Sequence, residues 1–132
     1  MCKMEDEMKD GQYGIELILD IHDCDPITFQ RANIKTFFTV LCDRIDMEAE
    51  DLHFWDDLDT PEEEKETEPH LIGTSAIQFI RTSNITIHTL DIMKRVYLNI
   101  FSCKDFDENI VRQTALDFFG GIIVSSHLIE RM

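Results

Sequence analysis

Apolar and polar side chains alternate along residues 14–22, the first regular segment of the chain. This period of two predicts a strand with one buried face. Residues 26–45 then carry apolar side chains at spacings of three and four, which predicts an amphipathic helix. Asp25 as N-cap and Pro26 at the first helical position mark its start, and Cys42 lies within its apolar stripe. We therefore expect Cys42 in the core.

The rest of the chain continues with β-rich runs and one more helix. The predicted strands are residues 52–58, 74–82, 84–90, 95–103 and 122–129. Apolar residues recur at helical spacing from Val111 to Phe119, and Gly120-Gly121 provides a stop. This order of elements predicts an α+β fold: a two-layer sandwich with an antiparallel or mixed sheet and both helices packed on one face.

The length of 132 residues predicts a single domain, because so short a chain cannot build two independent cores. Residues 1–12 are expected to be flexible. Residues 56–70 carry dense negative charge and few apolar side chains, so they cannot bury enough surface to order themselves. We expect this acidic segment to be a mobile surface loop.

The strongly negative net charge of the chain argues against two classes of partner, nucleic acids and anionic membranes. The chain has 12 basic and 27 acidic side chains, a formal net charge of −15, which repels phosphate backbones and anionic lipid headgroups. We predict no nucleic-acid partner and no membrane association. The acidic start lacks the pattern of a signal peptide, and no apolar run approaches the roughly 20 residues that span a bilayer. These features predict a cytoplasmic protein.

The cysteines and histidines show no metal-binding pattern. Cys2, Cys24, Cys42 and Cys103 are far apart and form no C-x-x-C pair, which favours reduced thiols over disulfides or a zinc ribbon. The tightest cluster of possible ligands is residues 22–25, but there Asp25 is already assigned to a helix cap. We therefore predict no metal site.

Candidate chemistry is concentrated in residues 75–103. Taken one at a time, Ser83 could be a turn residue, His88 a polar-face strand residue and Cys103 a small buried hydrophobe. Their joint spacing is more informative. Ser83 and His88 lie in the pattern S-x-x-x-x-H-T, Cys103 follows His88 by fifteen residues within Phe101-Ser102-Cys103, and Ser75 precedes Ser83 by eight.

This set resembles the self-processing S-adenosylmethionine decarboxylases of the short prokaryotic type. The family has the same serine–histidine pattern, F-T-C where this chain has Phe101-Ser102-Cys103, and G-x-S where it has Gly73-Thr74-Ser75. The resemblance extends from about Tyr13 to the last strand, and the acidic segment is the main region that does not match.

The resemblance implies roles for four residues. The chain would cleave itself between Thr82 and Ser83, and Ser83 would become a pyruvoyl cofactor at the new N-terminus. His88 would transfer protons during this maturation and Ser75 would hydrogen-bond the intermediate. The pyruvoyl group would form a Schiff base with the substrate amine, and Cys103 would reprotonate the substrate carbon after decarboxylation. The implied enzyme supplies spermidine biosynthesis and is a homodimer of processed protomers.

Departures from the family pattern leave the substrate open. Thr82 replaces the usual glutamate before the processed serine, and Leu90-Asp91-Ile92 replaces W-P-E. The family's glutamate is associated with the ribose hydroxyls of S-adenosylmethionine. Ile92 cannot accept a hydrogen bond, so Asp91 would have to reach the ribose, or the substrate lacks one. The alternatives are a pyruvoyl-dependent ornithine or arginine decarboxylase and an unprocessed, non-catalytic homologue that acts as a binding partner.

Overall fold

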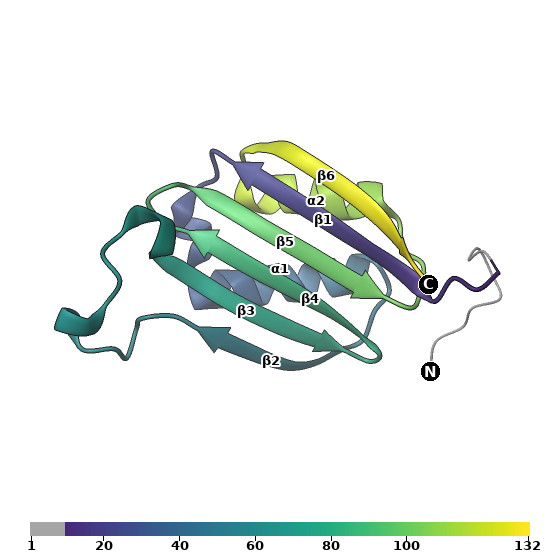
Figure 1. Ribbon diagram of the computed structural model, residues 1–132, viewed down its shortest axis with the longest axis horizontal. Coiled ribbons are helices and arrows are strands. Elements are labelled where there is room, and N and C mark those ends of the chain that lie inside the picture. The colour runs from purple at the N-terminus through teal and green to yellow at the C-terminus, as the bar shows by residue number, and fades with distance from the viewer. Residues whose placement is uncertain (1–9) are drawn as a thin grey trace.

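The computed structural model describes residues 10–132 and contains one six-stranded sheet (Figure 1). Its strands are β1 (Gly14–His22), β2 (Ala49–Trp55), β3 (Gly73–Ile80), β4 (Ser83–Leu90), β5 (Arg95–Ser102) and β6 (Ile122–Arg131). The strand order is β2-β3-β4-β5-β1-β6, and every neighbouring pair is antiparallel. The first strand of the chain therefore lies near the opposite edge from the second.

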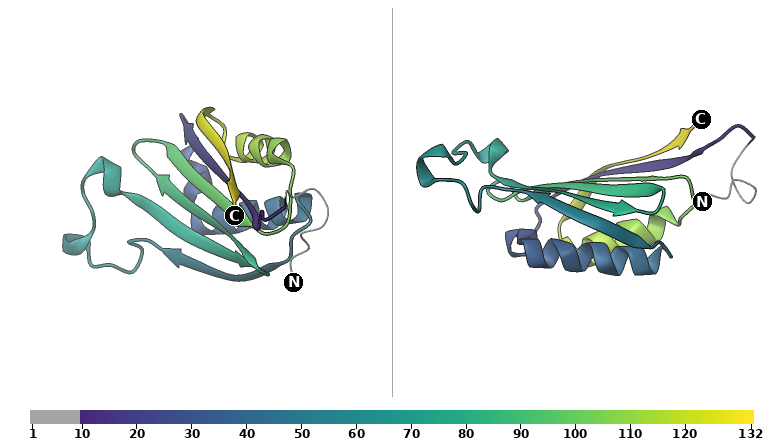
Figure 2. Two further views of the ribbon diagram at one scale, coloured as in Figure 1. Left: turned by 45° about the vertical axis from the view of Figure 1, so that its right-hand side comes forward. Right: turned by 90° about the horizontal axis from the view of Figure 1, so that it is seen from below.

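Two helices, α1 (Arg31–Arg44) and α2 (Glu108–Phe119), cover one face of this sheet and leave the other open (Figure 2). The odd-numbered residues of β1 and β4 point toward the helices, and their mostly apolar side chains are buried with those of α1 and α2. Cys42 lies in this core, as predicted. The predicted α+β sandwich with both helices on one face is confirmed, and its sheet is antiparallel.

The start of α1 differs from the prediction. Asp25 does act as a cap, because its side chain accepts a hydrogen bond from the Ile27 amide at 3.1 Å. The element that it caps is a short 3-10 helix, η1 (Pro26–Phe29), in which the Thr28 amide binds the Asp25 carbonyl oxygen. Gln30 is extended and separates η1 from α1. The predicted single helix is therefore two. The stop of α2 is as predicted, since Gly120 follows Phe119 with a φ of 70°.

The acidic segment is a surface connection between β2 and β3, as predicted, but its first residues are held in place. Asp56 accepts two hydrogen bonds from the Arg31 guanidinium, at 2.6 and 2.8 Å, and these lower the pKa of its carboxyl group. Asp57 accepts from the Glu66 amide at 3.0 Å. Two short 3-10 turns follow, η2 (Glu62–Glu64) and η3 (Pro69–Leu71). Because Asp56 turns toward Arg31, β2 ends at Trp55, three residues before the predicted end.

Residues 1–9, most of the segment predicted to be flexible, lie outside the described residues. Within residues 10–132, no helix is both long and apolar enough to cross a membrane.

Candidate active site

Ser75 and His88, predicted to act together, are brought together by neighbouring strands. They are cross-strand partners in the β3–β4 ladder, and Ser75 Oγ lies 2.6 Å from His88 Nδ1. Both side chains are on the helix-free face, where His88 is exposed. The two residues form a hydrogen-bonded pair that is open to a ligand or to another protein surface.

Ser83 begins β4 directly after a tight turn. Ile80 pairs with Ser83, so Arg81 and Thr82 form a two-residue hairpin loop. Thr82 has a φ of 65°, a left-handed conformation that is rare for a β-branched residue. Holding a residue in such a conformation costs on the order of 1–3 kcal/mol. Backbone strain is therefore located at the residue that precedes Ser83.

The side chain of Ser83 is buried against the end of β5. Ser102 is its cross-strand partner, and Ser83 Oγ donates a hydrogen bond to Ser102 Oγ at 3.1 Å. Cys103 Sγ lies 3.6 Å from the Thr82 carbonyl oxygen and 3.3 Å from Thr82 Oγ1. Ser83 and Cys103, two of the predicted site residues, are thus both located at the Thr82-Ser83 peptide.

Close backbone packing supports this end of the sheet from β1. A Cβ atom on Gly14 would lie 2.1 Å from the Ser102 carbonyl oxygen and 2.8 Å from the Cys103 Cα. Neither backbone atom could move away without disturbing the β1–β5 ladder, so only glycine fits here. The sequence analysis assigned no role to Gly14 or Ser102. For Ser102, the only signal was the hydroxyl-bearing residue in the family's F-T-C.

The cysteines differ in redox state. Cys24 and Cys42 are free, as predicted, and burial raises the pKa of both thiols to about 11, so they stay protonated near neutral pH. Cys103 is disulfide-bonded, contrary to the prediction of reduced thiols, and Cys2 lies outside the described residues. A disulfide sulfur carries no proton, so the predicted proton-donor role requires Cys103 to be reduced.

The two groups of site residues are far apart within one chain. Ser83 and His88 are five residues apart on β4, which at about 3.3 Å per residue corresponds to roughly 16 Å. Their side chains also point to opposite faces of the sheet. His88 therefore cannot hydrogen-bond the Ser83 hydroxyl of its own chain.

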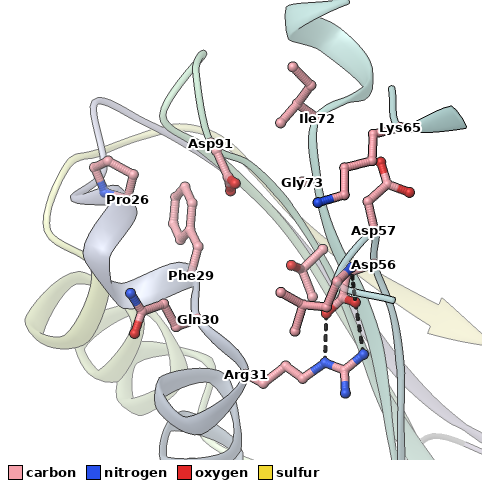
Figure 3. A pocket seen from close by; sticks show the side chains of 12 residues that line it. Pro26, Phe29, Gln30, Arg31, Asp56, Asp57, Lys65, Ile72, Gly73 and Asp91 are labelled. Atoms are coloured by element: carbon pink, nitrogen blue, oxygen red, sulfur yellow. Dashed lines mark hydrogen bonds and ion pairs between the residues drawn. The ribbon is translucent and has the colours of Figure 1, made fainter. Parts of the chain in front are cut away.

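A cavity of about 590 Å³ lies beside η1 and the start of β3 (Figure 3), and none of the four predicted site residues is among those that line it. It is lined by Pro26, Phe29, Gln30, Arg31, Asp56, Asp57, Leu58, Lys65, Ile72, Gly73, Thr74 and Asp91. Partial burial here raises the pKa of Asp91, whereas the neighbouring Ile92 is 56% exposed. Among residues 10–132, no three His, Cys, Asp or Glu side chains are grouped to hold a metal ion.

Comparison with known proteins assigns the family. A model of the S-adenosylmethionine decarboxylase family matches residues 15–132. The chain belongs to this family. The matched range includes all four predicted site residues.

A solved structure agrees in fold. The crystal structure of the adenosylmethionine decarboxylase from Aquifex aeolicus VF5 matches with a TM-score of 0.69 over 91% of each chain, at 14% sequence identity. At this identity the match shows a shared fold. No curated protein matches the chain in the sequence search.

Proposed function

We propose that the chain is a pyruvoyl-dependent S-adenosylmethionine decarboxylase that matures by cleaving its own Thr82-Ser83 bond. The observation that carries this proposal is the local geometry of that bond. A left-handed Thr82 precedes it, and the Ser83 hydroxyl is held by a hydrogen bond beside it, in a chain of this family. A strained backbone next to a positioned hydroxyl favours attack on an otherwise unreactive amide.

The first step is an acyl shift from nitrogen to oxygen. Ser83 Oγ attacks the carbonyl carbon of Thr82, a C–O bond forms and the C–N bond breaks. The hydroxyl proton ends on the Ser83 nitrogen, so the product is an ester with a free amine. No external reagent is consumed.

The second step separates the two chains. Loss of the Ser83 Cα proton breaks the Cβ–Oγ bond, and the oxygen leaves as part of the new Thr82 carboxylate. The remaining dehydroalanine tautomerises to an imine, water adds and ammonia leaves. Residues 83–132 then begin with a pyruvoyl group. The only co-reactant is water, and Ser83 is the residue type that this chemistry requires.

The chain's own residues would then support turnover. A pyruvoyl group on Ser83 would supply the electrophile for the substrate amine and the electron sink for decarboxylation. Cys103 lies next to the cleavage point, 3.6 Å from the Thr82 carbonyl oxygen, and in its reduced form would deliver a proton to the substrate carbon.

We further propose that two protomers complete each site. One chain keeps its Ser75–His88 pair roughly 16 Å along β4 from Ser83. The helix-free face also exposes large apolar side chains, namely Trp55, Ile77, Phe79 and Ile129. Sheets pack face to face through such surfaces. A two-fold axis between two stacked sheets would place the His88 end of one β4 over the Ser83 end of the partner's β4. Because the Ser83 hydroxyl points to the helix side of the sheet, the partner's pair would act on the Thr82-Ser83 backbone and not on that hydroxyl.

The family favours S-adenosylmethionine as the substrate, with the decarboxylated product as an aminopropyl donor for spermidine. Ile92 is exposed and cannot replace the family's glutamate as a hydrogen-bond acceptor for ribose. Asp91 is a carboxylate one residue away, and it lines the cavity beside η1. A basic amino acid is the alternative substrate, and carbon dioxide release from each candidate decides between them.

Intact-mass analysis of the purified protein tests self-cleavage. The wild-type chain should give two fragments, residues 1–82 and residues 83–132, the second with a pyruvoyl terminus. Ser83→Ala should give one intact, folded chain because only the nucleophilic oxygen is removed. An uncleaved wild-type chain would instead support a non-catalytic homologue, and two fragments from Ser83→Ala would show that another residue is the nucleophile.

A further inference from the structure

We propose that Ser102 is a positioning residue for self-cleavage, which holds the Ser83 hydroxyl with a lone pair available for attack. The inference rests on the proposed function and goes beyond the four residues assigned there. It concerns the step before the ester forms, when the geometry of Ser83 Oγ decides whether the hydroxyl can reach the Thr82 carbonyl carbon.

Hydrogen bonding fixes the Ser102 hydroxyl in one orientation. Its oxygen donates to the Lys104 carbonyl at 2.7 Å and accepts from the Lys104 amide at 2.9 Å. Ser83 Oγ is the third partner, at 3.1 Å. A serine hydroxyl has one proton and two lone pairs, so these three bonds use its full capacity.

The direction of the Ser83–Ser102 bond follows from this count. Because the Ser102 proton is committed to the Lys104 carbonyl, Ser102 can only accept from Ser83. Ser83 must therefore donate its proton toward β5, and the lone pairs of its oxygen point elsewhere. A hydroxyl that donates a hydrogen bond is also more electron-rich at oxygen, which favours nucleophilic attack.

The surrounding backbone holds the Ser83–Ser102 hydrogen bond in a fixed position. Ser102 is fully buried, and it lies opposite Ser83 in the β4–β5 ladder. Gly14 allows β1 to pack directly against the Ser102 carbonyl. His88 of the same chain is roughly 16 Å along the strand, too far to orient Ser83.

Ser102 does not act as a base in this proposal. It holds the Ser83 proton in a hydrogen bond while the C–O bond forms, and the proton ends on the Ser83 nitrogen when the C–N bond breaks. Ser102 has the same protonation state before and after the step. Its contribution is geometric, and misplacing a reacting group by about 1 Å can cost about 100-fold in rate.

The test compares Ser102→Thr with Ser102→Val. Threonine and valine have nearly the same shape, so both add the same bulk to a buried site, but only threonine keeps the hydroxyl. We expect Ser102→Thr to cleave within about 3-fold of the wild-type rate. Ser102→Val should cleave about 10- to 100-fold more slowly, as measured by intact mass over time after synthesis.

Two controls separate positioning from stability. In the uncleavable Ser83→Ala chain, Ser102→Val should unfold at a lower temperature than Ser102→Thr, because valine leaves the Lys104 amide and carbonyl without their partner. The cleavage rates are therefore compared below both unfolding midpoints, where both variants are folded. Hydroxylamine, which cleaves esters, should release fragments from Ser102→Thr during maturation and few from Ser102→Val. If the added methyl group prevents folding in both variants, Ser102→Ala adds no bulk and should show the same slow cleavage as a folded chain.

The outcomes distinguish this inference from the function on which it rests. A wild-type chain that stays intact overturns self-cleavage and Ser102 positioning together. A wild-type chain that cleaves, with a folded Ser102→Val or Ser102→Ala variant that cleaves equally fast, overturns the role of Ser102 alone.

Discussion

Cys103 is the residue at which self-cleavage and decarboxylation can be tested separately. Its sulfur lies 3.6 Å from the Thr82 carbonyl oxygen and 3.3 Å from Thr82 Oγ1, whereas the Ser83 hydroxyl is hydrogen-bonded to Ser102. The acyl shift does not need a Cys103 proton, because the Ser83 hydroxyl proton ends on the Ser83 nitrogen. After cleavage the new terminus at residue 83 stays next to this sulfur as long as β4 and β5 remain paired.

We expect Cys103→Ala to cleave between Thr82 and Ser83 but to lose most of its decarboxylase activity. A positioned acid contributes roughly 10²- to 10⁴-fold, and carbon dioxide release under reducing conditions measures the loss. Without the thiol, the proton can instead reach the pyruvoyl carbon and convert the cofactor to an amine. Mass analysis of residues 83–132 after incubation with substrate would detect this change.

Cys24→Ala is the matched control, because Cys24 is another buried cysteine that lies outside the predicted site. It should retain turnover. A matured Cys103→Ala enzyme with full turnover and an intact pyruvoyl group would leave Cys103 as a packing residue only.

The β3–β4 hairpin is the element that would prepare the bond for cleavage. A two-residue loop closes it, and Thr82 takes the left-handed conformation that glycine or asparagine normally occupies. The antiparallel ladders on both sides of β4 hold the hairpin in this register. The sheet thus maintains a strained residue next to Ser83.

Thr82→Gly should relieve this strain. In the uncleavable Ser83→Ala background we expect the free energy of unfolding to rise by about 0.5–1 kcal/mol, since glycine adopts positive φ without steric cost. In the wild-type background the same change should slow cleavage, because the starting amide is no longer strained. Denaturant unfolding and intact mass over time measure the two effects.

Arg81→Gly is the control for this pair, because Arg81 lies in the same loop but not at positive φ. It should not stabilise the chain, since glycine there only adds freedom to the unfolded state. Equal unfolding free energies for the two glycine variants would show that the conformation of Thr82 stores no usable strain.

At the scale of the whole molecule, the open sheet face is where the proposed composite site would form. His88 and its partner Ser75 lie on this face, close to exposed Trp55, which is paired with Ser75 across β2 and β3. A second copy of the chain would cover the apolar side chains and bring the backbone of its own Thr82-Ser83 bond toward this pair.

Co-expression of two inactive chains tests this arrangement. Ser83→Ala alone should remain uncleaved, and His88→Ala alone should remain uncleaved or cleave slowly. In a mixed dimer the Ser83→Ala chain supplies an intact Ser75–His88 pair to the Ser83 of the His88→Ala chain. We expect fragments from the His88→Ala chain only, identified by mass. No recovery of cleavage in mixed dimers would show that each site is built within one chain.

The sequence by itself determined the elements and the residue types of the candidate site. Strand alternation and helical spacing are local patterns, so the order of strands and helices and the one-sided helix layer followed from them. The spacing of Ser75, Ser83, His88 and Cys103 indicated the family, which the family model matched over residues 15–132. Asp25 was correctly predicted to be a cap for the same local reason.

Only the tertiary structure decided which residues of the candidate site contact one another. Strand register depends on packing between segments far apart in sequence, and it made Ser102 the partner of Ser83 while placing Gly14 against the end of β5. The positive φ of Thr82 depends on closure of the hairpin, and the end of β2 depends on the contact between Asp56 and Arg31. The period of two along β4 put Ser83 and His88 on opposite faces, but only the folded sheet showed which face was covered by helices and which was open.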